Sequence, residues 1–174
     1  MKRCTTIVRE ESNKWTYENV YIVPSCEQDG IDLGPNLRQA DKDEIQAAVG
    51  AEPSKALMES IKLSGDTGYT VKDLETDEPL ACFGTAPYDM NTGVVWFLGS
   101  DELFKKSRMS FLRNSAFWVE KLFGDFSLLF NVVDSRNKVH IRWLKWLDFK
   151  FIADIPEFGV EKRMFHQFVK YKEL

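Results

Sequence analysis

Apolar positions along the chain change spacing several times, from the alternation typical of strands to the three- and four-residue spacing typical of helices. Strands are predicted where aromatic and β-branched residues gather, and helices where amphipathic segments end at a glycine. The predicted strands span 15–23, 69–74, 80–85, 93–98, 128–133, 149–155 and 163–171. The predicted helices span 37–49, 53–63, 107–123 and 137–147. This order predicts a mixed α/β (α+β) domain.

Short turns at 76–79 and 87–92 join the three strands between 69 and 98, and they predict an antiparallel meander. Residues 1–14 are charged and weakly patterned, so we expect an accessory N-terminal segment before one domain at 15–174. A chain of 174 residues with 44% apolar content is long enough for one sizeable core.

Charge and composition narrow the function classes. The net charge of −4 gives no overall positive field that would attract nucleic acid. Basic residues cluster at 105–113 and 136–145, where they form either solvated faces or a site for an anionic ligand. No apolar run approaches the roughly 20 residues that span a bilayer, so no membrane role is predicted. Three widely spaced cysteines, Cys4, Cys26 and Cys82, indicate a reducing compartment.

One segment carries a specific pattern. Residues 137–149 read Asn-Lys-Val-His-Ile-Arg-Trp-Leu-Lys-Trp-Leu-Asp-Phe, and the opening Asn is a good helix cap. This segment resembles the last helix of GNAT-type N-acetyltransferases, and the predicted order of elements is similar to theirs over roughly 15–171. The resemblance implies a GNAT-like, mostly antiparallel central sheet of about six to seven strands flanked by about four helices.

A narrower resemblance rests on residues 40–54, 96–101 and 137–145, with the run His-Ile-Arg-Trp-Leu-Lys at 140–145 as its most specific part. These segments are similar to the GNAT-like internal virion protein A group of short-tailed (podovirus) bacteriophages. That resemblance implies a phage-encoded protein of virion morphogenesis. It also implies that the protein is located in the cytoplasm of the bacterial host, with association with the virion as an alternative.

The GNAT resemblance implies acetyl-CoA as the cofactor, bound by the backbone of a parted strand and by the amides of the following helix. The positions that match are Phe97, Leu98, Gly99, Lys106, Ser107, Arg108 and Asn137. The glycine-containing phosphate turn of the family falls at 102–110, where this chain has no glycine. That departure puts a close phosphate cradle in doubt.

Catalytic candidates are few. The tyrosine that serves as general acid in many GNAT enzymes corresponds to Leu144, which cannot donate a proton. His140 is the one catalytic candidate, and the alternative is a structural histidine with satisfied hydrogen bonds. The carboxylates that could act as a general base lie near a turn and are better explained as solvated turn residues: Asp73, Glu75, Asp77 and Glu78. No metal-ligand spacing is present, so no metal is predicted.

Two hypotheses follow. In the first, the chain is an assembly protein with degenerate acetyltransferase chemistry that contacts viral structural or internal core proteins, with Trp143 and Trp146 as candidate interface residues. In the second, it is an active N-acetyltransferase that modifies an amine on a host or viral protein. A host-inhibiting protein that binds a bacterial partner is a third alternative.

Overall fold

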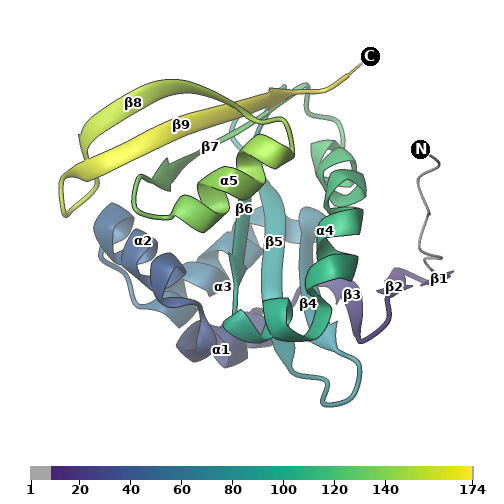
Figure 1. Ribbon diagram of the computed structural model, residues 1–174. Helices are drawn as coiled ribbons and strands as arrows, with labels where there is room; N and C mark the ends of the chain where they lie inside the picture. The colour runs from purple at the N-terminus through teal and green to yellow at the C-terminus, as the bar shows by residue number, and fades with distance from the viewer. Residues whose placement is uncertain (1–8, 174) are drawn as a thin grey trace.

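The computed structural model describes residues 9–173, apart from the side chains of residues 9–11 and 108–111. Its nine strands form one sheet in the order β1-β2-β3-β4-β5-β6-β7-β9-β8 (Figure 1). All neighbouring strands are antiparallel except β6 and β7, which are parallel. The predicted α/β class with a mostly antiparallel sheet is therefore confirmed, and the sheet has more strands than the predicted six to seven.

The strands are β1 Arg9–Glu11, β2 Lys14–Thr16, β3 Val20–Pro24, β4 Gly68–Asp73, β5 Pro79–Pro87, β6 Thr92–Gly99, β7 Leu128–Asp134, β8 Lys150–Phe158 and β9 Arg163–Tyr171. The α-helices are α1 Glu27–Leu33, α2 Gln39–Val49, α3 Pro53–Ser64, α4 Asp101–Phe123 and α5 Lys138–Trp146. Two short 3₁₀ turns, Gly34–Asn36 and Gly65–Thr67, follow α1 and α3.

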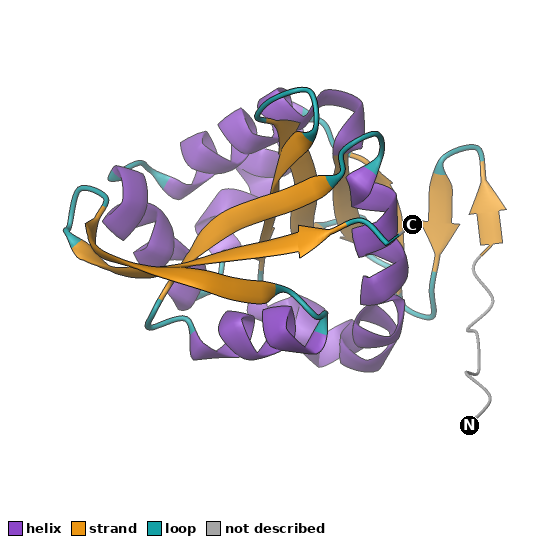
Figure 2. Cartoon of the chain, turned by 90° about the horizontal axis from the view of Figure 1, so that it is seen from above, coloured by secondary structure: helices purple, strands orange, loops and turns teal. Residues whose placement is uncertain are grey.

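Helices lie on both faces of the sheet (Figure 2), and alternation along the central strands builds a core on each face. On β6, Phe97 points to the core shared with α4 and α5, whereas Trp96 points to the smaller core under α2 and α3. The larger core holds stacked and edge-on aromatic rings around Trp118, including Trp15 at 5.1 Å and Phe83 at 5.2 Å between ring centroids. The helices thus cover both faces and leave the strand edges for other contacts.

Several elements differ from the prediction, among them β1 at 9–11, where no strand was predicted. The predicted strand at 15–23 is two strands, because the chain turns between Tyr17 and Val20, where Tyr17 N–H donates to Val20 C=O at 2.8 Å. Helix α1 was not predicted, since its glycine at position 30 suggested a break; Gly30 lies against Met58 of α3, where a Cβ would be only 3.0 Å from the Met58 backbone nitrogen. Helix α4 begins at Asp101, six residues before the predicted start.

The β8–β9 hairpin reaches across the molecule and ends on α2. The backbone N–H groups of Val160 and Glu161 donate to the carbonyls of Ala48 and Ala47 at 3.3 and 3.2 Å. These carbonyls belong to the last turn of the helix, where no intrahelical partner is available. Gly159 has φ +70°, and a Cβ there would lie 2.3 Å from the Ala47 carbonyl oxygen. Only glycine allows this approach of the hairpin to the helix.

We predict that Gly159→Ala destabilises the protein by roughly 2–4 kcal/mol, because the left-handed backbone costs about 1 kcal/mol and the steric overlap about 1–3 kcal/mol more. Gly50→Ala is the matched control, since Gly50 has φ +64° but its Cβ would meet side-chain atoms alone, of Val160 at 3.3 Å and of Gln46 at 3.9 Å. Urea unfolding of both variants measures the difference. Equal losses would contradict the close contact at Gly159.

Candidate functional site

The candidate site is the place where β6 and β7 part. The two strands pair only from Thr92 to Val94 on β6 and from Leu128 to Phe130 on β7. Beyond Val94 they diverge, because β7 continues its pairing with β9 while β6 stays with β5. The Asn131 amide bridges the start of the gap by donating to the Val95 carbonyl at 2.8 Å. Figure 1 shows the β7-β9-β8 part of the sheet turned away from the rest.

The far end of the gap is held by groups of this chain. Gly99 N–H donates to Asp41 Oδ2 at 3.1 Å, and the Gly99 carbonyl accepts from Arg38 N–H at 2.9 Å. Arg38 and Asp41 form an ion pair of 2.7 Å in which both side chains are almost fully buried. Burial raises the pKa of the Asp41 carboxyl, against the effect of the Arg38 guanidinium. The backbone of β6 is therefore engaged by α2 at Gly99.

The region after β6 lacks the features of a phosphate cradle. Residues 101–106 form a helical turn that continues into the rest of α4 across a kink at Ser107, which has φ −144° and ψ 23°. Lys106 is directed to Asp73 at the end of β4, with which it forms an ion pair. The Arg108 side chain lies outside the described residues, and so does that of Met109. Because residues 101–106 are helical, they do not provide the glycine loop in which the resemblance places the pyrophosphate of acetyl-CoA.

A cavity of about 900 Å³ lies at the gap. Its lining comes from both faces of the sheet, including Trp96 and Leu98 toward α2 and α3, and Phe97 and Trp118 toward α4 and α5. Since the same cavity contacts both faces, the parted strands connect the two sides of the sheet. A volume of this size is at the upper end of the range for small-molecule sites.

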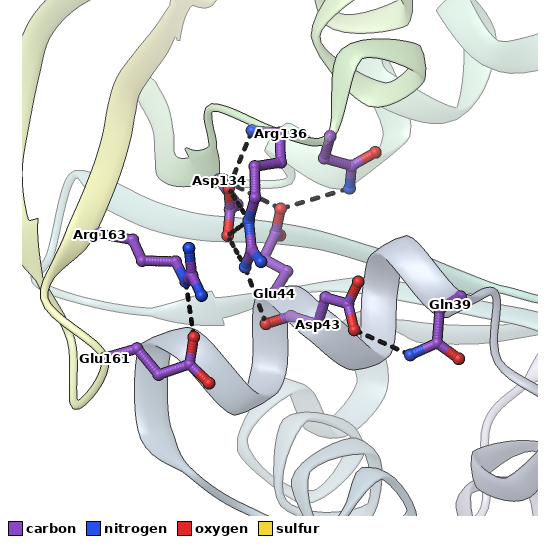
Figure 3. Close-up of polar contacts among 8 residues, drawn as sticks. Gln39, Asp43, Glu44, Asp134, Arg136, Glu161 and Arg163 are labelled. Atoms are coloured by element: carbon purple, nitrogen blue, oxygen red, sulfur yellow. Dashed lines mark hydrogen bonds and ion pairs between the residues drawn. The ribbon is translucent and has the colours of Figure 1, made fainter.

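Glu44 on α2 is one of the polar residues that line the cavity, and Figure 3 shows its contacts. Glu44 Oε2 accepts from the Asp134 backbone N–H at 3.0 Å and from Asn137 Nδ2 at 3.3 Å. Burial, together with the negative charges of Asp41 and Asp134, raises the pKa of Glu44 to about 7. Asp134 itself stays ionised, because Arg136 donates to both of its oxygens and lowers its pKa against the effect of burial. Glu44 is therefore a carboxyl that can exchange a proton near neutral pH.

Three rings separate the large cavity from a smaller one of about 330 Å³ between α4 and α5. Phe97 packs edge-on against Trp143 at 5.0 Å between centroids and against His140 at 6.4 Å. His140 is buried, and its Nδ1 has no hydrogen-bond partner among the described residues. Burial lowers the pKa of His140 to about 3, so the ring is neutral at pH 7. The expectation of a histidine with satisfied hydrogen bonds does not hold for Nδ1.

The residues singled out from the sequence do not form one cluster. Phe97, Leu98 and His140 line the large cavity, and Gly99 lies at the end of the gap. Asn137 caps α5 by accepting from His140 N–H at 3.4 Å and also donates to Glu44. Lys106 and Asp73 pair with each other away from both cavities. Glu44 was missed, because its partners lie some ninety residues later in the chain.

The parted strands and the helices on both faces define the class: the chain has the fold of the GNAT acetyltransferases. The ribosomal-protein-S5-alanine acetyltransferase from Vibrio fischeri superposes with a TM-score of 0.65 at 10% identity, covering 92% of this chain and 97% of that chain. A GNAT-family acetyltransferase from Bacillus anthracis gives 0.66 at 10% identity, covering 92% and 99%. Ard1 from Thermoplasma volcanium gives 0.64 at 11% identity, covering 90% and 100%. The predicted GNAT-type fold is confirmed.

Sequence comparison gives a narrower likeness. Residues 80–155 match the family model described as "Bacteriophage T7, probable scaffold protein Gp13". This segment runs from β5 into β8 and includes the parted strands and α5, which agrees with the resemblance to phage proteins. No curated protein sequence matches the chain.

No helix in the described part of the chain is long and apolar enough to cross a membrane. No group of three or more His, Cys, Asp or Glu side chains in residues 9–173 is arranged to hold a metal ion.

We predict that Glu44→Gln removes a pH dependence of stability. A folded-state pKa of about 7, against 4.5 for the unfolded chain, favours the protonated carboxyl, so this stabilisation is complete below pH 4.5 and lost as pH rises through 7. The glutamine oxygen can accept both hydrogen bonds and carries no charge. The variant therefore gains up to about 3 kcal/mol relative to the wild type between pH 4.5 and 8.

Urea unfolding at several pH values measures this difference. Asp43→Asn, on the exposed side of the same helix, is the control for removal of one carboxylate from α2. A constant difference between Glu44→Gln and the wild type across this pH range would show that Glu44 ionises normally.

Proposed function

We propose that this chain is a phage-encoded GNAT-fold protein that acts in virion assembly through protein contacts, in the host cell and on the assembling virion, with degenerate acetyltransferase chemistry. Viral structural or internal core proteins are its proposed partners. The match of residues 80–155 to a phage scaffold family supports a role in virion assembly. The contacts at Gly99 support the loss of acetyltransferase activity.

The observation that carries the proposal is the engagement of the β6 backbone by α2. A pantetheine arm that bound along this edge would have to displace Asp41 and Arg38 from Gly99. That displacement would remove two hydrogen bonds, and each buried polar group left without its partner costs roughly 1–3 kcal/mol. The helical turn at 101–106 adds a second obstacle, because it offers no glycine loop for the phosphates.

A second candidate function, acetyl-CoA-dependent N-acetyltransfer to an amine on a host or viral protein, is favoured by one observation. Glu44 lines the large cavity and has a pKa of about 7, which suits a general base for an amine at neutral pH. The general acid of many GNAT enzymes remains without a counterpart, since Leu144 is buried and apolar.

Isothermal titration with acetyl-CoA and with CoA tests the loss of cofactor binding. We expect no heat of binding up to millimolar ligand, because the phosphate cradle is missing; an active GNAT acetyltransferase is the positive control. Micromolar binding that is weakened at least roughly tenfold by Lys106→Glu or Arg108→Glu would contradict the proposal and favour the enzyme.

A complementation experiment distinguishes a role in protein contacts from a role in catalysis. In a phage that lacks this gene, we expect the Glu44→Gln chain supplied in trans to restore infectious particles to within about twofold of the wild-type chain, since one proton-exchanging group is of no consequence to an assembly contact. A loss comparable to the roughly 10²–10⁴-fold contribution of a general base would indicate an enzyme. Intact particle yield without the gene would contradict an assembly role altogether.

A further inference from the structure

The exposed face of α5 differs from the rest of this acidic chain. The helix contains three cations and no carboxylate, although the whole chain has a net charge of −4. Lys138, Arg142 and Lys145 are spaced by four and three residues, so they lie on one side of the helix. No ion pair recorded within residues 9–173 involves any of the three. This stripe is therefore a local positive surface without an internal counter-charge.

Apolar surface accompanies the charge. Trp146 is 61% exposed and Val139 is 53% exposed, and both share a side of the helix with Arg142. A largely exposed tryptophan beside an arginine is the residue combination most enriched among the energetic centres of protein interfaces. The helix thus presents a side chain of large potential contact area at the C-terminal end of its basic stripe.

A cavity opens next to this face. The 330 Å³ cavity between α4 and α5 includes Val139 in its lining, so it is continuous with the exposed stripe. Phe104, Leu112 and Trp143 also line it, and so does buried His140, whose Nδ1 has no hydrogen-bond partner among the described residues. A volume near the lower limit for ligand pockets suits one inserted apolar side chain.

We propose that this face of α5 is a docking surface for an acidic segment of a partner protein, with an apolar side chain of that segment inserted between α4 and α5. Carboxylates of the segment pair with Lys138, Arg142 and Lys145, and Trp146 covers the segment from the side. The proposal rests on the proposed function, because it names the surface through which assembly contacts are made.

Charge decides between an acidic peptide and nucleic acid. A nucleic acid strand would extend beyond one short helix onto a molecule with an overall negative charge, where its phosphates would be repelled. A short acidic segment ends where the basic stripe ends. Charge complementarity therefore favours the peptide.

The test uses a random peptide library displayed on yeast and selected on the full-length chain, followed by fluorescence anisotropy with the enriched peptides. We expect peptides with two or more Asp or Glu residues around an aromatic or aliphatic residue. Their binding should weaken at least roughly tenfold in Arg142→Glu/Lys145→Glu and in Trp146→Ala. The matched control, Lys55→Glu/Lys62→Glu on α3, changes the charge by the same amount and should bind within about twofold of the wild type.

Each other outcome overturns the proposal. Enriched peptides without acidic residues, equal binding to the Arg142→Glu/Lys145→Glu variant, or no enrichment at all would remove α5 as an acidic-peptide site. Displacement of the peptides by a single-stranded oligonucleotide would assign the face to nucleic acid, and a dimer dissolved by the same charge reversals would assign it to a second copy. The complementation and titration experiments remain independent, so failure here leaves the assembly role itself standing.

Discussion

The attachment of α2 to the end of β6 is the contact on which the site depends. One buried aspartate, Asp41, holds the Gly99 amide and the Arg38 guanidinium at the same time. The hydrogen bond from Arg38 N–H to Gly99 C=O joins the start of α2 to the end of β6. Glu44, one turn further along the helix, is thereby placed against Asp134 on the other side of the gap. The same contact of α2 with Gly99 thus holds the end of β6 and places Glu44 in the lining of the cavity.

Much of the fold could be predicted from local pattern, because the central strands alternate and α2, α3 and α5 carry clear apolar stripes. Prediction failed where tertiary contact overrides local preference. Gly34, whose Cβ would lie 2.4 Å from Ser54 Cα, reflects close packing beneath α3, although glycine in a sequence suggests a loop. The early start of α4 was hidden because the serine at position 107 looks like a cap and is a kink.

The site was harder to predict than the fold. Asn137 could be recognised as a cap from its place before an amphipathic run, and the structure adds its bond to Glu44. Nothing in the sequence around Glu44 indicates burial, since the segment Asp41-Lys-Asp-Glu44 reads as a charged surface. Its pKa is raised by burial and by the negative charges of Asp41 and Asp134, against the effect of the hydrogen bonds from the Asp134 backbone and Asn137, and the fold brings these groups together. His140 shows the opposite case, because its neutral state follows from burial that an apolar stripe already suggests.

The contact between the hairpin tip and α2 has a consequence for folding during translation. The carbonyls at the end of α2 find their partners in Val160 and Glu161, which leave the ribosome long after α2 itself. Until then the helix end is solvated and the Phe165 wall of the large cavity is absent. Translation therefore produces first an open, partly built sheet and only at its end the closed one. A nascent chain stalled before β9 would contain the phage-family segment at 80–155 without the strand that pairs with β7 and β8.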